Sequence, residues 1–342
     1  GHSSSEPPCL SSEMQAKVEE EQLLVTQGLT IDRPKLCVGE LRPTADEPKS
    51  KVLAQLEALL EPKPRVGDRI APIVPYEDNS IAHSEIHFES RIGRGSFGSV
   101  WKGLCRGEVV AIKQMHDADD EQGAENFVRE TGYLQHLRHP RLVSFLGFCN
   151  DTRHILLLME FMPGGSLHTL LFKTKTTLRM LQKVKMSLQV SEGLSYLHDV
   201  SVVHRDLKTM NIVLDSDLNC KICDFGLMVT LERTHLTVKE FQGSPRYMAP
   251  EQFETDSKIT EKVDIWQMGC LMLELFCLSI PFAKATNVQC MATELIVNKR
   301  PPSIPRDTDP RARTLIHATL QIQPQSRPDA ENLVEAFRFL LG

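Results

Sequence analysis

The pattern of hydrophobic and polar positions changes along the chain. From about residue 87, short runs rich in strand-forming residues predict β-structure, and after Leu167 apolar residues recur at helical spacing. The expected strands are 88–92, 99–103, 108–114 and 154–161, and the clearest helices are 180–198 and 262–277. A β-rich segment followed by a mainly helical one predicts an α+β fold, with a small lobe over about 86–161 and a larger lobe over about 162–342.

The first 85 residues form a different kind of region. They hold nine of the 20 prolines, which interrupt regular structure, so we expect an extended and only partly helical N-terminal extension. An acidic stretch over 12–27 can form one helix. A second, amphipathic helix is predicted near 50–60, where the apolar stripe consists of Val52, Leu53, Leu56, Leu59 and Leu60. A helix this short is marginal alone, so we expect it to dock on its own chain; the alternatives are a partner protein or self-association, and no stable helix at all.

Composition and charge exclude several classes of protein. The chain has 342 residues and a net charge of -6, and the extension carries all of this excess, with 9 Lys and Arg against 15 Asp and Glu. Because the remainder is neutral and has no basic stripe, nucleic acid and anionic membranes are not expected as main partners.

The longest aliphatic run, 155–159, is far shorter than the roughly 20 residues that span a bilayer. Nine scattered cysteines suit reduced thiols, and the first residues lack a signal-peptide core, so we expect a soluble, cytoplasmic protein.

A glycine-rich turn lies between two of the expected strands, where residues 93–98 read Gly-Arg-Gly-Ser-Phe-Gly. Similar runs occur in dinucleotide-binding folds, but a helix follows there, whereas this pattern continues as a strand. Further on, Lys113 ends the apolar run Val-Ala-Ile-Lys, a costly place for an ammonium group unless it meets an anion. Taken alone, Lys113 is better explained as an edge-strand lysine that reaches water.

Three more motifs follow in order. Residues 204–211 read His-Arg-Asp-Leu-Lys-Thr-Met-Asn, residues 224–226 read Asp-Phe-Gly, and residues 249–251 read Ala-Pro-Glu. Together with the glycine-rich turn and Lys113 they form the signature set of protein kinases, so the chain over about 86–342 resembles that family. The resemblance implies a bilobal protein-kinase fold, ATP-dependent phosphoryl transfer to protein substrates, and a role in signalling.

The resemblance also implies roles for individual residues. Asp206 is expected to orient the substrate hydroxyl and accept its proton, and Lys208 to neutralise charge on the transferred phosphate. Lys113 is expected to hold the α- and β-phosphates and to be aimed by Glu130 of the following helix, with Glu125 as the alternate.

ATP and a divalent metal are the implied cofactors. Oxygen donors suit a hard cation, so Mg²⁺, with Mn²⁺ as an alternative, is expected on Asn211 and Asp224. Apolar walls with a few polar contacts suit a nucleotide slot. The expected nucleotide-binding residues, besides Lys113, are Ile92, Gly93, Gly95, Gly98, Val100, Ala111, Met159, Glu160, Met162 and Leu214. Met159 is the expected gatekeeper, and residues 160–162 are the expected hinge.

Two features of the resemblance indicate Ser/Thr substrates. Lys208 stands where serine/threonine kinases place a lysine, and Ser244 stands where they place a hydroxyl against the catalytic aspartate. The run Arg-Tyr-Met over 246–248 resembles the tyrosine-kinase-like group, from which Gln267 and Met268 depart.

Other implied features concern structure and regulation. The family pattern implies a buried Glu251–Arg327 ion pair and an Asp264 side chain that tethers the catalytic loop. Arg205 beside the catalytic aspartate implies control by phosphorylation of the activation loop, whose candidates are Thr230, Thr234 and Thr237. The alternatives that remain are a pseudokinase or scaffold that binds nucleotide without turnover, and a kinase of dual specificity.

Overall fold

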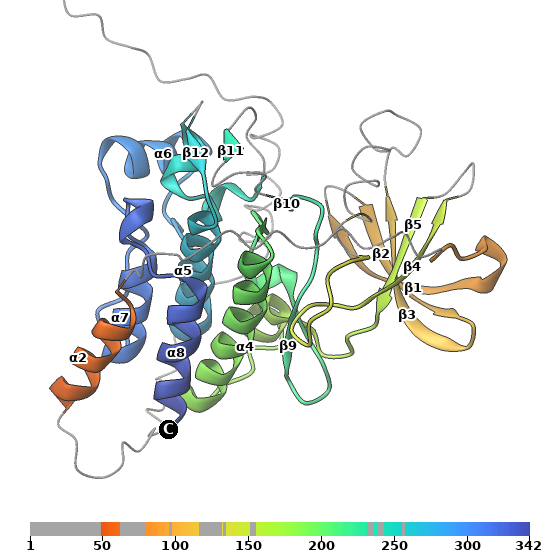
Figure 1. The fold of residues 1–342 in the computed structure, drawn as a ribbon, viewed down its shortest axis with the longest axis horizontal. Coiled ribbons are helices and arrows are strands. Elements are labelled where there is room, and N and C mark those ends of the chain that lie inside the picture. Colours follow the sequence, from red (N-terminus) through yellow and green to blue (C-terminus); the bar gives the residue numbers. More distant parts are fainter. Residues whose placement is uncertain are drawn as a thin grey trace, which may run out of the picture.

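The computed structural model describes residues 49–61, 79–95, 98–115, 132, 135–150, 155–230, 236–237, 243–254 and 257–342. Within these residues a small β-rich lobe and a larger helical lobe lie side by side, as the α+β pattern predicts (Figure 1). The acidic stretch 12–27, Glu125, Glu130 and Thr234 lie outside the described residues. Among the described helices, none is long and apolar enough to cross a membrane.

The small lobe is built on an antiparallel sheet with strand order β1-β2-β3-β5-β4. Its strands are β1 (Ile86–Gly95), β2 (Gly98–Cys105), β3 (Glu108–Met115), β4 (Phe145–Asn150) and β5 (Ile155–Glu160). The apolar run of β5 is buried on both faces, because Leu156 and Leu158 pack in one cluster of the lobe while Leu157 packs in the main core. Strand β4 is absent from the sequence prediction.

The large lobe surrounds α5 (Lys262–Cys277), which is buried along almost its whole length. The helices α4 (Met180–Asp199) and α7 (Pro310–Thr319) pack against it, α8 (Ala330–Leu341) packs against α4, and α6 (Val288–Ala292) is a short helix. The predicted helices 180–198 and 262–277 are thus confirmed to within one residue. Short strands complete the lobe: β6 (Gly165–Ser166), β7 (Val202–Val203), β8 (Ile212–Leu214), β9 (Cys220–Ile222), β10 (Val229–Thr230), β11 (Leu236–Thr237) and β12 (Lys258–Ile259).

The amphipathic helix of the extension is α2 (Lys49–Leu59), and it packs against α7 and α8 of the large lobe (Figure 1). Leu56 is fully buried and Leu60 nearly so, both within the main core cluster. The expectation that this stripe docks on its own chain is therefore confirmed, and the alternative of self-association through it gains no support.

Candidate active site

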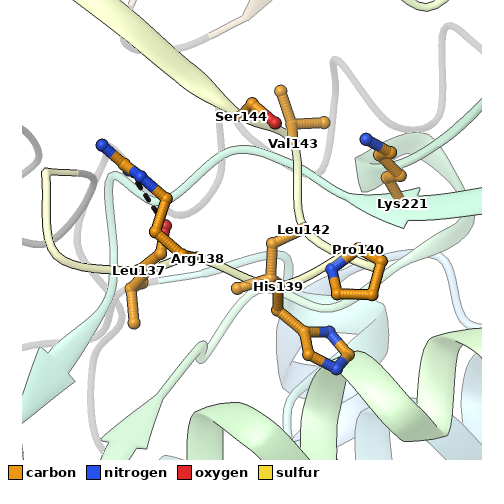
Figure 2. A pocket seen from close by; sticks show the side chains of 8 residues that line it. All are labelled: Leu137, Arg138, His139, Pro140, Leu142, Val143, Ser144 and Lys221. Atoms are coloured by element: carbon orange, nitrogen blue, oxygen red, sulfur yellow. Dashed lines mark hydrogen bonds between the residues drawn. The ribbon is translucent and has the colours of Figure 1, made fainter.

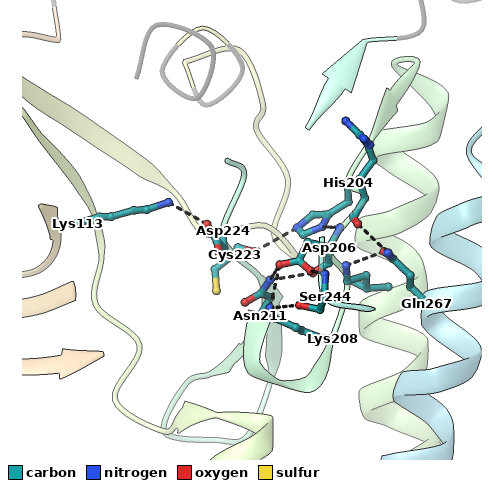
Figure 3. A network of polar contacts seen from close by, with 11 residues as sticks. Lys113, His204, Asp206, Lys208, Asn211, Cys223, Asp224, Ser244 and Gln267 are labelled. Atoms are coloured by element: carbon teal, nitrogen blue, oxygen red, sulfur yellow. Dashed lines mark hydrogen bonds and ion pairs between the residues drawn. The ribbon is translucent and has the colours of Figure 1, made fainter. Parts of the chain in front are cut away.

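Polar groups converge on Asp206, in the loop between β7 and β8 (Figure 3). The side-chain amide of Asn211 donates to the Asp206 carbonyl at 2.8 Å and to its carboxylate at 3.1 Å. The Lys208 ammonium lies 3.0 Å from the same carboxylate and donates to the Ser244 hydroxyl at 2.5 Å. The Ser244 N–H donates to the other carboxylate oxygen at 3.1 Å. One nearly buried carboxylate is thus placed beside a cation and a hydroxyl of the segment that begins at Gly243.

The backbone of this loop is bound by side chains of α5. Asp264 accepts hydrogen bonds from the N–H groups of His204 and Arg205, at 2.9 and 2.8 Å, as the sequence predicts. Gln267 accepts from the Leu207 N–H at 2.8 Å and donates to the Arg205 carbonyl at 2.7 Å. These contacts place Asp206 through the most deeply buried helix of the fold.

Lys113 of β3 reaches across to Asp224, which follows β9, and the Lys113 ammonium lies 2.9 Å from the carboxylate (Figure 3). Burial by itself raises the pKa of Asp224, but the Lys113 ammonium and its hydrogen bond outweigh burial and bring that pKa well below its ordinary value. Asp224 therefore stays ionised over the physiological range. Its backbone has a φ of 64°, the left-handed conformation, which turns the chain sharply after the strand.

The residues present fit a divalent cation and a phosphate group. Asn211 uses its amide nitrogen on Asp206, so its oxygen is the atom that can face a metal, and Asp224 offers a carboxylate. Mg²⁺ is commonly held by one or two protein oxygens together with substrate phosphates. Lys113 supplies a positive charge beside the same carboxylate, where a phosphate can share it. Glu130, the predicted partner of Lys113, lies outside the described residues.

Four of the predicted slot residues lie together. Buried Ala111 and Met159 form a small apolar cluster with Val143, and partly buried Val100, Met162, Val213 and Cys223 pack against it. Ile92 is half exposed and is not part of this cluster. The sequence analysis did not single out Val143, which precedes β4, because no periodic pattern marks it.

The placement of Leu214 in the slot is wrong. Leu214 is fully buried in the main core, and its neighbour Val213 packs against the slot cluster instead. The reason is the two-residue period of β8: side chains of consecutive residues point to opposite faces of a strand. Counting from β8 residues that face the core, such as Ile212, would have placed Val213 on the opposite face.

The glycine-rich turn closes the β1–β2 hairpin, with Gly95 paired to Gly98; residues 96–97 lie outside the description. A Cβ on Gly98 would lie 2.2 Å from the backbone oxygen of Gln114, so only glycine allows this approach to β3. At Gly93 the nearest atom to a Cβ is 3.6 Å away, which leaves room for alanine.

The expected hinge begins at Glu160, whose groups are already engaged. Its N–H donates to the Ser144 carbonyl at 3.0 Å, and its carboxylate accepts from Ser144 and from the Lys221 ammonium, the latter at 2.6 and 2.8 Å. The Glu160 N–H is thus already engaged and is not available to a nucleotide. Ser144 and Lys221 also border an open pocket beside the hinge, which is otherwise lined by Leu137, Arg138, His139, Pro140, Leu142 and Val143 (Figure 2).

The segment after Gly243 is anchored to the core of the large lobe. Arg327, fully buried, forms the predicted ion pair with Glu251 through two contacts of 2.6 and 2.8 Å. Tyr247 donates to buried Glu274 of α5 at 2.6 Å, and Thr209 of the catalytic loop donates to the same carboxylate. The catalytic loop and the segment after Gly243 are therefore both anchored to the Glu274 carboxylate of α5.

Comparison with known proteins agrees with this fold. Residues 86–337 match the protein kinase domain, so the chain belongs to the protein kinase family. A probable serine/threonine-protein kinase of Dictyostelium discoideum is 36% identical over 255 residues, which are 74% of this chain and 28% of that protein. The serine/threonine-protein kinase CTR1 of Arabidopsis thaliana is 30% identical over 318 residues, 89% of this chain and 38% of the relative.

A third relative carries a different name. The dual specificity protein kinase shkC of Dictyostelium discoideum is 32% identical over 262 residues, 75% of this chain and 51% of that protein. The chain thus spans about half or less of the length of these three relatives.

Proposed function

We propose that the protein transfers the γ-phosphate of ATP to serine and threonine hydroxyls of protein substrates. The observation that carries this proposal is the group formed by Asp206, Lys208 and Ser244: the Lys208 ammonium lies 3.0 Å from the Asp206 carboxylate and 2.5 Å from the Ser244 hydroxyl, and the Ser244 N–H donates to that carboxylate at 3.1 Å. Family membership supports ATP and a divalent metal as cofactors in general, and we propose Mg²⁺, with Mn²⁺ as the alternative.

In this mechanism Asp206 orients the substrate hydroxyl and accepts its proton, since a carboxylate within hydrogen-bonding reach can do both. Lys208 offsets the negative charge that develops on the transferred γ-phosphate, and Lys113 holds the α- and β-phosphates. Asn211 and Asp224 would hold the divalent metal, which would offset the negative charge of the phosphates.

The nucleotide is proposed to lie against the cluster of Ala111, Met159 and Val213. Ile92, Val100, Met162 and the carbonyl of Glu160 complete the proposed slot, and Gly93, Gly95 and Gly98 form its phosphate cover. Glu130 remains the proposed partner of Lys113.

Dual specificity is the second candidate, because two relatives, shkC and shkA, carry that name. The Lys208–Ser244 contact favours the serine/threonine reading. Phosphoamino-acid analysis of a phosphorylated protein substrate distinguishes the two: phosphotyrosine in the product would favour dual specificity.

The test of the proposal is Asp206→Asn beside the exposed control Asp217→Asn. Loss of a general base is expected to lower kcat by about 10²- to 10⁴-fold, with nucleotide binding retained, while the control stays active. A wild-type protein that binds ATP and transfers no phosphate would instead be a pseudokinase. Near wild-type turnover by Asp206→Asn would show that the assignment of the base is wrong.

The remaining predictions are proposals about context. We propose a domain boundary near residue 86, a cytoplasmic location based on the cysteine pattern, and control by phosphate on the activation loop. Changing Thr230, Thr234 and Thr237 together to Ala tests that control, because turnover should then no longer respond to phosphatase.

A further inference from the structure

Gln267 departs from the pattern of the group that this sequence resembles, and its side chain lies against the catalytic loop (Figure 3). It is fully buried on α5, one helical turn after Asp264 and on the same face. Its amide oxygen accepts from the Leu207 N–H at 2.8 Å, and its amide nitrogen donates to the Arg205 carbonyl at 2.7 Å. One side chain therefore bonds the backbone on both sides of Asp206.

The two bonded groups belong to the two peptide planes that flank Asp206. The Arg205 carbonyl lies in the plane before it and the Leu207 N–H in the plane after it. Because each peptide unit is planar, the orientations of these planes determine φ and ψ of the residue between them. Fixing both planes on one amide thus fixes the direction in which the Asp206 side chain leaves the backbone.

The loop has a conformation that needs such support. Arg205 has a φ of 68°, a left-handed conformation that is unfavourable for a residue other than glycine. Its N–H is held by Asp264 at 2.8 Å and its carbonyl by Gln267 at 2.7 Å. Asp264 and Gln267 therefore hold the strained residue from both ends.

The primary amide of Gln267 meets both demands at once. An N–H can only donate and a carbonyl can only accept, so the bonded side chain must accept at one atom and donate at the other. Serine, the residue that the resembling group usually has here, is too short to span both planes. A buried backbone group that loses its hydrogen-bond partner is unfavourable, so each of the two bonds matters.

We propose that Gln267 is a positioning residue for Asp206, whose amide fixes the backbone on both sides of that carboxylate. This inference deepens the proposed function, since it assumes that Asp206 is the base. The expectation is that removing the amide slows the chemical step while leaving ATP affinity unchanged, because Gln267 lies on the core side of the loop.

The first variant is Gln267→Met, which keeps the length of the side chain and removes both bonds. Its matched control is Gln189→Met on α4, another buried glutamine that also has two bonds, to the Cys220 N–H and to Asn219. Similar losses of Tm are expected, but kcat should fall about 10- to 100-fold further in Gln267→Met, with little change in KM for ATP. Equal kcat values in the two variants at equal Tm would overturn the proposal.

The second variant is Gln267→Glu, which keeps the acceptor and loses the donor when ionised. Burial raises the pKa of a carboxyl group, and its protonated form can again donate to the Arg205 carbonyl. The ratio of its kcat to that of wild type should therefore rise as the pH is lowered. A ratio that does not change with pH would contradict the proposal.

Amide hydrogen exchange separates this proposal from the proposed function. In Gln267→Met, peptides covering 204–207 should exchange faster than in wild type, and in Gln189→Met they should not. Unchanged exchange in Gln267→Met would overturn the positioning role, even where the protein is an active kinase. If wild type transfers no phosphate, the proposed function fails while the exchange result still decides whether Gln267 holds the loop.

Discussion

The two halves of the candidate active site are held by different kinds of contact. In the large lobe, Asp264 and Gln267 bind the backbone around Asp206 from a helix that is itself buried. In the small lobe, Lys113 is placed by the pairing of β3 with its neighbour strands, and it meets the large lobe at Asp224. The catalytic loop is thus set within one lobe, whereas the distance between Lys113 and that loop depends on both.

The largest expected effect tests the anchoring in the large lobe. Arg327→Met leaves Glu251 near the core without its partner, so the free energy of unfolding should fall by about 3 to 5 kcal/mol in urea titrations. Arg311→Met is the control, because its partner Asp309 is partly exposed and the loss there should be below about 1 kcal/mol. Equal losses in the two variants would mean that the buried pair is no stronger an anchor than a surface pair.

The next largest effect tests the small-lobe half of the candidate active site, where the β-sheet positions Lys113. Lys113→Met should lower kcat/KM by about 10²- to 10³-fold, because one charge that stabilises the phosphates is lost. Lys102→Met on β2, where the lysine pairs with Glu89 near the surface, should keep wild-type kinetics. Retained activity in Lys113→Met would contradict the proposed role of Lys113, and with it the contribution of the small lobe to phosphate binding.

A smaller effect is expected where the extension joins the large lobe. Leu56→Ala should reduce the free energy of unfolding by about 2 to 3 kcal/mol, since it empties a fully buried site between α2 and the lobe. Leu53→Ala, on the same helix but only half-buried, should cost clearly less. If both variants are equally stable, α2 does not pack as described and does not contribute to the core of the large lobe.

The smallest effect concerns pH. Burial, and then the Lys173 and Lys208 ammonium groups, lower the pKa of His168 from 6.5 to about 4. His168 therefore becomes protonated below about pH 6.5 in the unfolded chain, but only near pH 4 in the folded protein. The free energy of unfolding consequently falls as the pH drops through this window. Partial exposure of the ring limits the effect to about 1 kcal/mol.

His168→Gln tests this pH effect. Its Tm should decline less than that of wild type between pH 6.5 and 4, with exposed His87→Gln as the control. Parallel Tm curves for wild type and His168→Gln would contradict it.

Much of the small lobe could be predicted from local pattern, but not all of it. Strands β1, β2, β3 and β5 carry enough apolar residues at strand spacing to be recognised. Strand β4 was missed because Gly147 interrupts a short run, and the strand is defined by its pairing with β5. Leu214 was placed on the wrong face because the facing of β8 depends on its neighbours β6 and β9.

The sequence by itself determined the order of the motifs, and with it Lys113, Asp206, Asn211 and Asp224 as the candidate groups, since such motifs require particular residue types at particular spacing. The tertiary structure alone decided how those groups are held. Gln267 lies about 60 residues from the loop that it bonds, and Leu56 lies in the core of a lobe that begins a hundred residues later. Contacts between distant segments come from packing, which local periodicity does not record.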